Sequence, residues 1–544
     1  MSDGTREKSH WGWGWADQFP SADERRERGK QAQMLLGFAP ERVDEPVPLG
    51  DVQIAAARVV PPASLTAVFD TRDEARIRHT HGRNYPDIVR GFRGDFAGAP
   101  DAVAFPRDED DVTRVLDWAS ANDVVVVPYG GGTSVVGGIS AGSSQLTGKG
   151  CDDGARPPFV SLDLSRLSRL LELDVPSRSA RIQAGASGPR LEAQLAQHGF
   201  TLRFFPQSFE FATLGGWIAT RAGGHFAMGP THIDDLVQST RTVTPRGVVE
   251  TRRLPGSGAG PSPDRLMLGS EGTLGVITEA WMRVRPKPVH RSTATCFFKA
   301  WNDAVAAVRA LSQSGLYPAN CRLLDAREAA LNLVSVDGSA VLILGFEGAD
   351  HAFHGPMARA LELVADHGGR CPKGALHAEE GAKSGDEGGA GAWKRAFIDA
   401  PYMLNLLASL GLVVDTFETA CTWDRFEALH AGVIKAVRDA MKREAGRGFV
   451  SCRFTHVYPD GPAPYFTFVL PGGGAEIERW VAVKQAASEA VVRHGGTITH
   501  HHAVGRVHQP WYVQQVPDLF RVAFRAAKRE LDPAGIMNRG VFAL

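Results

Sequence analysis

The sequence lacks several features that would assign it to a familiar class at once. Its 6 cysteines are scattered through 544 residues without a CxxC pair, which argues against a disulfide framework or a cysteine zinc site. No apolar run approaches the roughly 18 residues that suggest a membrane-spanning helix, and residues 1–15 have no secretory-signal pattern. The net charge of -1 gives no basic excess for nucleic acid. We therefore expect a cytoplasmic protein without a nucleic-acid partner, with peripheral membrane contact left open.

A cluster of glycines is the most informative feature that the sequence does contain. Residues 124–138 read VVVVPYGGGTSVVGG, a β-branched run typical of a buried strand, stopped by Pro128. The glycines that follow let consecutive amides converge on an anion such as a pyrophosphate. No Lys lies among them, which excludes a P-loop, and the Gly- and Ser-rich Ile139–Gly150 excludes the helix of the dinucleotide fingerprint. A binding loop is favoured over a flexible surface loop.

The pattern of the chain changes near Pro286–Pro288. Before this point a strand–helix–strand unit at Ala102–Val127 is followed by further short strands. After it, amphipathic helices such as Trp301–Leu311 and Ile477–His494 alternate with strands. This alternation suggests an α+β domain with an antiparallel sheet, and the length of the chain allows two or three domains. The tryptophans of Trp11–Trp15 are expected to dock on the body of the protein.

Three glycine-rich segments occur in a fixed order: PYGGGTSVVGG, PQSFEFATLGGWIATRAGGH and GSEGTLGVITEA. Together they resemble the FAD-binding domain of the vanillyl-alcohol-oxidase (para-cresol methylhydroxylase, PCMH) flavoprotein superfamily. One such loop is a weak signal, whereas three in register are a specific one. Further segments, FETACTWDR, SCRFTHVYPDGPAPYFTF, GGTITHHHAVG and LDPAGIMNRG, resemble the alkyldihydroxyacetonephosphate synthase (alkylglycerone-phosphate synthase)-like branch and its bacterial homologues.

The resemblance implies an α+β fold, with a two-subdomain PCMH-type FAD-binding domain and an α+β cap domain built on an antiparallel sheet. The expected segments are an N-terminal arm and lead-in (1–96), the FAD-binding domain (97–288), a substrate or cap domain (289–500) and a C-terminal segment that returns to the FAD domain (501–544). A homodimer is common in the superfamily and is expected here.

The resemblance also implies FAD as the cofactor, with the pyrophosphate in the first loop. The residues implied for it are Pro128, Gly130, Gly131, Gly132, Thr133, Ser134 and Gly137 at the pyrophosphate, Gln207, Ser208, Thr213, Gly215, Gly216, Thr220 and Gly224 at the flavin, and Glu271, Gly272 and Ile277 at the adenosine. Members that bind flavin covalently often use a His in or near the first loop. Because Val124–Ser140 contains neither His nor Cys, we predict non-covalent FAD.

The reacting side chains come from the same resemblance. Tyr465 matches the family's active-site tyrosine, His500, His501 and His502 match its histidine triplet, and Arg322 matches an arginine that would orient the substrate. A phenol titrates near ~10 and an imidazole near ~6.5, so a Tyr beside a His can relay a proton. In a strand, the outer two histidines would point one way and the middle one the other.

Other interpretations of these residues stay open. Tyr465 can be an amphipathic strand residue with its hydroxyl in water, and the HxH spacing of His500 and His502 suits a metal site. The stretch PDGPAPYF supplies no further histidine of the kind found in related D-2-hydroxy-acid dehydrogenases. We therefore expect no metal.

Two departures from the synthase pattern bear on the substrate. Phe204 stands where the synthase has a His, and Leu404 where it has an Arg. Both changes remove cations that would bind a phosphate monoester and add apolar surface, unless Arg83, Arg90 or Arg203 compensates. Phe204 and Leu404 are therefore expected in the wall of the substrate pocket.

These inferences favour an FAD-dependent oxidoreductase, an oxidase or dehydrogenase acting on a hydroxyl-bearing, relatively apolar small molecule. A Tyr/His pair would abstract a proton while hydride passes to flavin N5. The alternative is an alkylglycerone-phosphate synthase, which exchanges the acyl chain of acyl-dihydroxyacetone phosphate for a fatty alcohol through a flavin N5 adduct. A third interpretation, a flavin-binding protein without catalysis, is disfavoured by the presence of Tyr465 and the histidine triplet.

Overall fold

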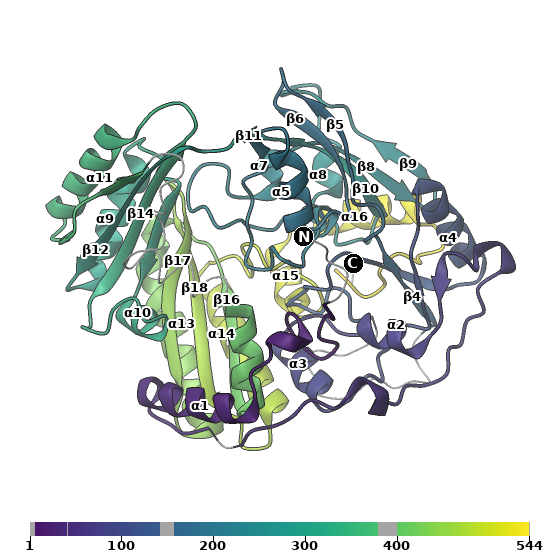
Figure 1. The fold of residues 1–544 in the computed structure, drawn as a ribbon, viewed down its shortest axis with the longest axis horizontal. Coiled ribbons are helices and arrows are strands. Elements are labelled where there is room, and N and C mark those ends of the chain that lie inside the picture. Colours follow the sequence, from purple (N-terminus) through teal and green to yellow (C-terminus); the bar gives the residue numbers. More distant parts are fainter. Residues whose placement is uncertain (1–5, 41, 142–156, 379–399, 543–544) are drawn as a thin grey trace.

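The computed structural model describes residues 6–40, 42–141, 157–378 and 400–542, so most of the Gly- and Ser-rich Ile139–Gly150 lies outside the described residues. Figure 1 shows two lobes, one around the sheets formed by β1 to β10 and the other around the green sheet that contains β12 to β18. The first lobe holds a four-stranded sheet in the order β1-β2-β4-β3 and a five-stranded sheet in the order β5-β6-β10-β8-β9. Their bounds are β1 Phe69–Asp70, β2 Ala102–Ala104, β3 Val125–Tyr129, β4 Phe159–Asp163, β5 Leu170–Asp174, β6 Ser179–Gln183, β8 Val237–Thr244, β9 Gly247–Glu250 and β10 Val276–Arg283.

The four-stranded sheet positions the glycine loop. β3 pairs in parallel with the central β4, and the loop leaves the end of β3 at Tyr129. Between β2 and β3 the chain forms α4 (Glu109–Ala121), whose cap residue Asp108 accepts a hydrogen bond from the Asp111 amide at 2.9 Å. Its apolar stripe is buried in the core, so the predicted strand–helix–strand unit is confirmed.

The second lobe is a seven-stranded sheet in the order β15-β12-β14-β13-β17-β18-β16. All its neighbouring strands run antiparallel, as predicted. The strands are β12 His290–Phe298, β13 Asn320–Leu324, β14 Ala340–Gly348, β15 Leu376–Ala378, β16 Leu412–Glu418, β17 Phe449–Val457 and β18 Pro462–Pro471. The helices that pack on it include α9 Trp301–Gln313, α11 His354–Asp366, α13 Trp423–Ala445 and α14 Glu476–Arg493 (Figure 1). The expected α+β fold is confirmed.

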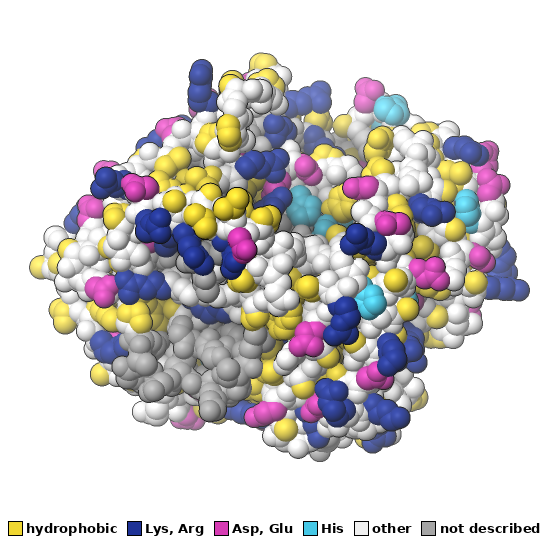
Figure 2. All heavy atoms as spheres, turned by 180° about the vertical axis from the view of Figure 1, so that it is seen from behind, with side chains coloured by type: hydrophobic (Ala, Val, Ile, Leu, Met, Phe, Trp, Pro, Cys, Tyr) yellow, Lys and Arg dark blue, Asp and Glu magenta, His cyan; other side chains and the backbone are white. Residues whose placement is uncertain are grey.

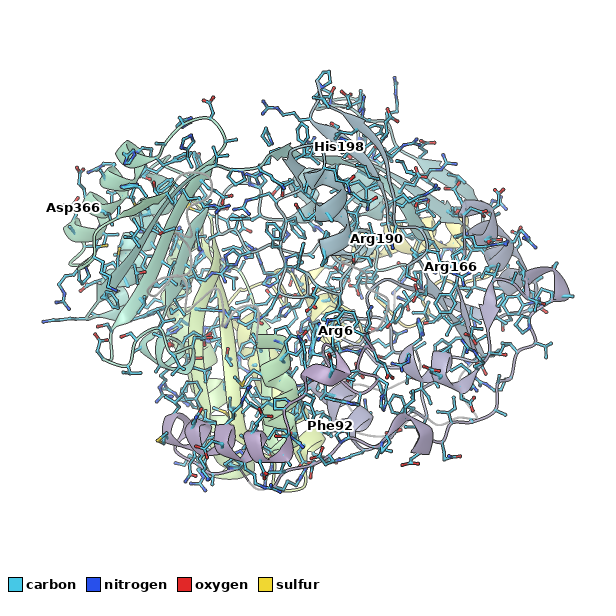
Figure 3. The ribbon with its side chains drawn as sticks, viewed as in Figure 1. Arg6, Phe92, Arg166, Arg190, His198 and Asp366 are labelled. Atoms are coloured by element: carbon cyan, nitrogen blue, oxygen red, sulfur yellow. The ribbon has the colours of Figure 1, made fainter. Side chains whose placement is uncertain are left out.

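Both ends of the described chain fold back onto this body. Trp11 is buried, and its ring packs edge-on against Phe92 of α3 (Tyr85–Phe92, Figure 3) with centroids 4.5 Å apart. The helix α1 (Ala22–Leu36) lies across one end of the second sheet (Figure 1), where Gly29 faces Leu410. After α15 (Gln509–Gln515) and α16 (Asp518–Leu531), the C-terminal segment returns to β3, where the Val126 amide donates to the Ile536 carbonyl at 2.9 Å.

Figure 2 shows basic and acidic side chains interspersed over one face of the molecule. None of the helices in the described part of the chain combines the length and the hydropathy that crossing a bilayer requires.

Candidate active site

A cavity of about 1060 Å³ opens between the two lobes, and the glycine loop forms part of its wall. Residues 131–134 line the cavity, and their amides donate no hydrogen bond to any described residue. Gly131 packs so tightly that an added Cβ would lie 2.0 Å from the Phe211 carbonyl oxygen, and Gly132 has a φ of +72°. Successive amides without an internal acceptor suit a diphosphate, so the loop fits the phosphate end of FAD.

Most of the predicted cofactor residues lie around the same cavity. Those that line it are Pro128, Gly130, Gly131, Gly132, Thr133, Ser134, Gln207, Ser208, Thr213, Gly215, Gly216, Thr220, Gly224, Glu271, Gly272 and Ile277. Gly137 is not among the lining residues: its carbonyl accepts a hydrogen bond from Arg506 at 2.8 Å. The fold therefore brings the predicted cofactor residues together around one cavity, except Gly137, which does not line it.

A clamp from the C-terminal segment holds the loop, and it is built from segments that the sequence analysis connected only with the family resemblance. Asn538 donates from its side-chain amide to the carbonyls of Gly138 at 3.1 Å and Glu271 at 2.7 Å. The buried Glu271 carboxylate in turn accepts the amides of Val504 at 2.8 Å and Gly505 at 3.0 Å. The loop, the third glycine-rich segment and the stretch after the histidine triplet are thereby joined.

This clamp predicts a specific pH dependence of stability. Burial raises the pKa of Glu271 to about 7, although the Val504 and Gly505 amides oppose the rise, whereas an unfolded Glu titrates near ~4.3. The pKa of Glu271 is higher in the folded protein than in the unfolded chain. The stabilisation that its protonated carboxyl gives the folded state is therefore complete below pH ~4.3 and is lost as the pH rises through about 7. From roughly pH 5 to pH 8 the carboxyl should lower the free energy of unfolding by about 2–3 kcal/mol.

Denaturant unfolding at a fixed excess of FAD measures this effect. The Glu271→Gln variant keeps a carbonyl oxygen for the Val504 and Gly505 amides and cannot ionise, so its stability should fall less over the same pH range. Curves of the wild type and the variant that stay parallel throughout would contradict the assignment.

Tyr465 lies where the cofactor region meets the second lobe. On β18 it is paired across the sheet with Glu418 of β16 and with Arg453 of β17. The Arg453 guanidinium lies 3.9 Å from the centre of the Tyr465 ring, and the phenol donates to the Thr416 hydroxyl at 2.8 Å. Burial raises the pKa of Tyr465, with Arg453 opposing. The residue is thus a buried phenol in the cavity wall, not a water-facing strand tyrosine.

The histidine triplet is not in a strand, so the alternation expected for one does not apply. Its turn is held by the buried Glu418 carboxylate, which accepts the amides of all three histidines, at 3.0 Å from His501 and 2.9 Å from His502. His501 and His502 line the cavity, with ring centres 6.1 and 5.5 Å from that of Tyr465. His500 contacts the Tyr458 hydroxyl instead, at 2.7 Å.

The electrostatics leave the cavity histidines neutral and the arginines charged. Burial lowers the pKa of His501 to about 3 and that of His502 to about 4. Burial, with Arg453 nearby, lowers the pKa of Arg322 to about 9, which still leaves a cation at neutral pH. Arg322 and Arg453 both line the cavity, and Glu328 pairs with Arg453. Two buried guanidinium groups border the cavity in this region, and guanidinium groups suit an anionic ligand.

Of the two residues expected in the substrate wall, the fold places one there. Leu404 lines the cavity. Phe204 is 1% exposed, packs against Trp217 with ring centres 5.1 Å apart and belongs to the core behind the wall. Among the arginines considered as replacements, Arg83 lines the cavity, whereas Arg203 pairs with Glu347 and lies outside the lining.

Many residues that line the cavity are apolar, and most of them come from α1, from residues 331–333 and from the segment before β16; we call this part of the lining the apolar arm. The same segments also contribute the polar Arg28, Gln31 and Asn332. The apolar side chains of the arm are Trp13, Met34, Leu35, Leu36, Leu331, Leu333, Met403, Leu404, Leu406, Leu407, Val414 and Val469. Such a lining suits a hydrocarbon chain better than a small polar substrate.

The mode of cofactor attachment stays a prediction that a simple measurement checks. Among the described residues that line the cavity there is no cysteine, and Val124–Ser140 contains neither His nor Cys. Acid precipitation of the purified protein should release all its yellow chromophore into the supernatant, as seen by its absorption spectrum. Colour that remains in the washed pellet would indicate a covalent bond.

Comparisons with known proteins agree with this geometry. Residues 100–252 match the family described as FAD binding domain, and residues 287–541 match FAD linked oxidases, C-terminal domain. An alkyldihydroxyacetonephosphate synthase of Trypanosoma brucei brucei is 28% identical, over 97% of this chain and 91% of the relative. The Caenorhabditis elegans synthase is 30% identical, over 85% of this chain and 80% of the relative. A solved alkyldihydroxyacetonephosphate synthase structure superposes with a TM-score of 0.80 at 24% identity, covering 98% of both chains.

Three observations point to the same family. They are the order of the two matched regions along the chain, the cavity-lining amides of the glycine loop, and the similarity to relatives over most of their length. The chain belongs to the alkyldihydroxyacetonephosphate synthase-like branch of the FAD-linked oxidases and is an FAD-dependent enzyme.

Proposed function

We propose that the protein catalyses a synthase-type exchange on an amphiphile with an anionic head and a long hydrocarbon chain, in which a fatty alcohol replaces an acyl chain. The observation that carries the proposal is the composition of one cavity. Two buried arginines, Arg322 and Arg453, line the same cavity as Tyr465 and as the residues of the apolar arm, and the Arg453 guanidinium lies over the Tyr465 ring. The full-length likeness to alkyldihydroxyacetonephosphate synthases supports the same choice.

The chain's own residues divide the work between binding and proton transfer. Arg322 and Arg453 bind the anionic head, with Glu328 holding the Arg453 guanidinium in place. The apolar arm takes the hydrocarbon chain and excludes water. Bound FAD supplies flavin N5, at which the transferring group or a hydride is accepted. The Tyr465 phenol and the neutral imidazole of His502 lie in the same cavity, with ring centres 5.5 Å apart, so a proton that passes between the substrate and this pair stays inside the cavity.

Oxidation of a hydroxyl-bearing apolar molecule is the second candidate. Leu404 in the wall favours it, because this residue supplies apolar surface where a cation was expected. The same Tyr/His pair would then remove the hydroxyl proton as hydride leaves the neighbouring carbon.

An exchange assay separates the two candidates. The purified enzyme is incubated with palmitoyl-dihydroxyacetone phosphate and isotopically labelled hexadecanol. The proposal predicts label in an ether lipid and an equal amount of released palmitate. Absence of label in the lipid, with conversion of the alcohol to aldehyde, would overturn the exchange and favour oxidation.

A further inference from the structure

A cluster of three histidines lies at the wall of the cavity: His456 and His501 line it, and His500 lies next to them. His456 of β17 has its ring centre 4.8 Å from that of His500 and 5.4 Å from that of His501. Each of the three offers one ring nitrogen, and these nitrogens all lie within 4.8 Å of one another. Imidazole nitrogens gathered in this way from separate elements are typical ligands for zinc and similar ions.

His456 is oriented as a ligand. Its Nε2 lies 3.0 Å from the Gly224 carbonyl oxygen. Because a carbonyl only accepts, Nε2 carries the proton and Nδ1 has the lone pair. That Nδ1 is buried and has no hydrogen-bond partner among the described residues. A carbonyl that fixes the far nitrogen of an imidazole is the usual support of a metal-binding histidine.

His500 and His501 face the same point. Their Nδ1 atoms are 3.0 Å apart, close to the separation of two nitrogens that share one zinc ion at about 2.0–2.1 Å each. The Tyr458 hydroxyl at 2.7 Å and His232 at 3.1 Å support the far nitrogen of His500. Glu418 fixes the backbone of both residues through their amides, so the pair is preorganised.

We propose that His456, His500 and His501 bind one divalent transition-metal ion, with Zn²⁺ as the probe of choice. Three protein ligands leave a position for a substrate oxygen, as in catalytic zinc sites. That position would face the cavity, which His456 and His501 both line. The ion would supply a Lewis acid beside Tyr465 and leave His502 as a proton acceptor. The sequence-based expectation of no metal rested on the stretch PDGPAPYF, which supplies no further histidine, whereas the third ligand proposed here, His456, lies just before that stretch on β17.

Metal binding itself tests the proposal, and it does not depend on the exchange reaction. FAD-loaded protein is stripped with a chelator, dialysed, and titrated with Co²⁺ and Zn²⁺. We expect one ion per chain and the visible absorption bands of a nitrogen-ligated, four- or five-coordinate Co²⁺. Loss of a contact that only supports a metal ligand lowers metal affinity by about 10–100-fold. Because His456→Ala and His501→Ala each remove a ligand itself, we expect each variant to weaken Zn²⁺ binding by more than this.

A second histidine pair provides the matched control. His354 and His377 lie with ring centres 4.1 Å apart in the second lobe, and their double replacement by alanine should leave the stoichiometry and the Co²⁺ spectrum unchanged. Retained flavin absorbance shows that each variant is folded, and His456→Asn serves if His456→Ala is not. Two results would overturn the proposal in favour of a hydrogen-bonded proton relay. One is binding of less than a tenth of an ion per chain, and the other is a Co²⁺ spectrum that stays unaltered in folded His456 and His501 variants.

Discussion

Replacement of Tyr465 by phenylalanine should lower kcat by about 10²–10⁴-fold, the range expected for loss of a positioned general acid or base. The substitution removes the hydroxyl that donates to Thr416 and keeps the ring under the Arg453 guanidinium. FAD content and substrate affinity should therefore change little. Steady-state turnover, together with the flavin absorbance of the purified variant, measures both expectations.

A second buried tyrosine controls for loss of a hydroxyl as such. Tyr85 is fully buried, donates to the Leu412 carbonyl at 3.0 Å and does not line the cavity. Tyr85→Phe should cost about 1 kcal/mol of stability and leave kcat at the wild-type value. A Tyr465→Phe enzyme that is as fast as Tyr85→Phe would remove Tyr465 from the chemistry.

Gly131→Ala should yield protein that is nearly colourless. The added Cβ would meet the Phe211 carbonyl oxygen at 2.0 Å, and neither a backbone atom nor a methyl group can rotate away. The loop must shift, and its amides lose their alignment on the diphosphate. Two lost bonds to a charged group, at about 1.5–3 kcal/mol each, correspond to an FAD affinity at least about 100-fold lower. Titration of the apoprotein with FAD, followed by flavin fluorescence, measures the affinity.

The same substitution at an open glycine isolates this effect. Gly256 lies exposed in the same lobe, with nothing within 4 Å of an added Cβ. Gly256→Ala should bind FAD as tightly as the wild type. Full FAD binding by a folded Gly131→Ala protein would show that the loop does not grip the cofactor through its amides.

Local signals made the framework of the fold predictable. Three of the four β-branched residues before Pro128 lie in β3, because such side chains suit a buried strand, although the strand runs on through Pro128 to Tyr129 instead of stopping at the proline. The acidic start and the apolar stripe of α4 likewise determine a helix without help from distant residues. The glycine loop was recognised because few other roles require so many glycines after a buried strand.

The parts that the sequence did not reveal depend on partners far away in the chain. Glu418 draws the amides of the histidine triplet, about 80 residues later, into a turn instead of a strand. Phe204 was expected in the wall of the substrate pocket from its place in the family pattern. In the structure its ring packs against Trp217 in the hydrophobic core instead. His456 and Arg453 stand in the segment SCRFTHVYPDGPAPYFTF, but only the packing of β17 shows what they face: Arg453 lies over the Tyr465 ring, and His456 contacts Gly224 and His500.

If this cavity holds FAD against an anionic head and a long chain for group exchange, anaerobic mixing of the enzyme with acyl-dihydroxyacetone phosphate and a fatty alcohol should show it. The flavin spectrum and the products are followed together. We expect many turnovers of ether-lipid product per flavin, with the flavin oxidised at the end. One-to-one bleaching of the flavin by the alcohol, without ether-lipid product, would contradict it.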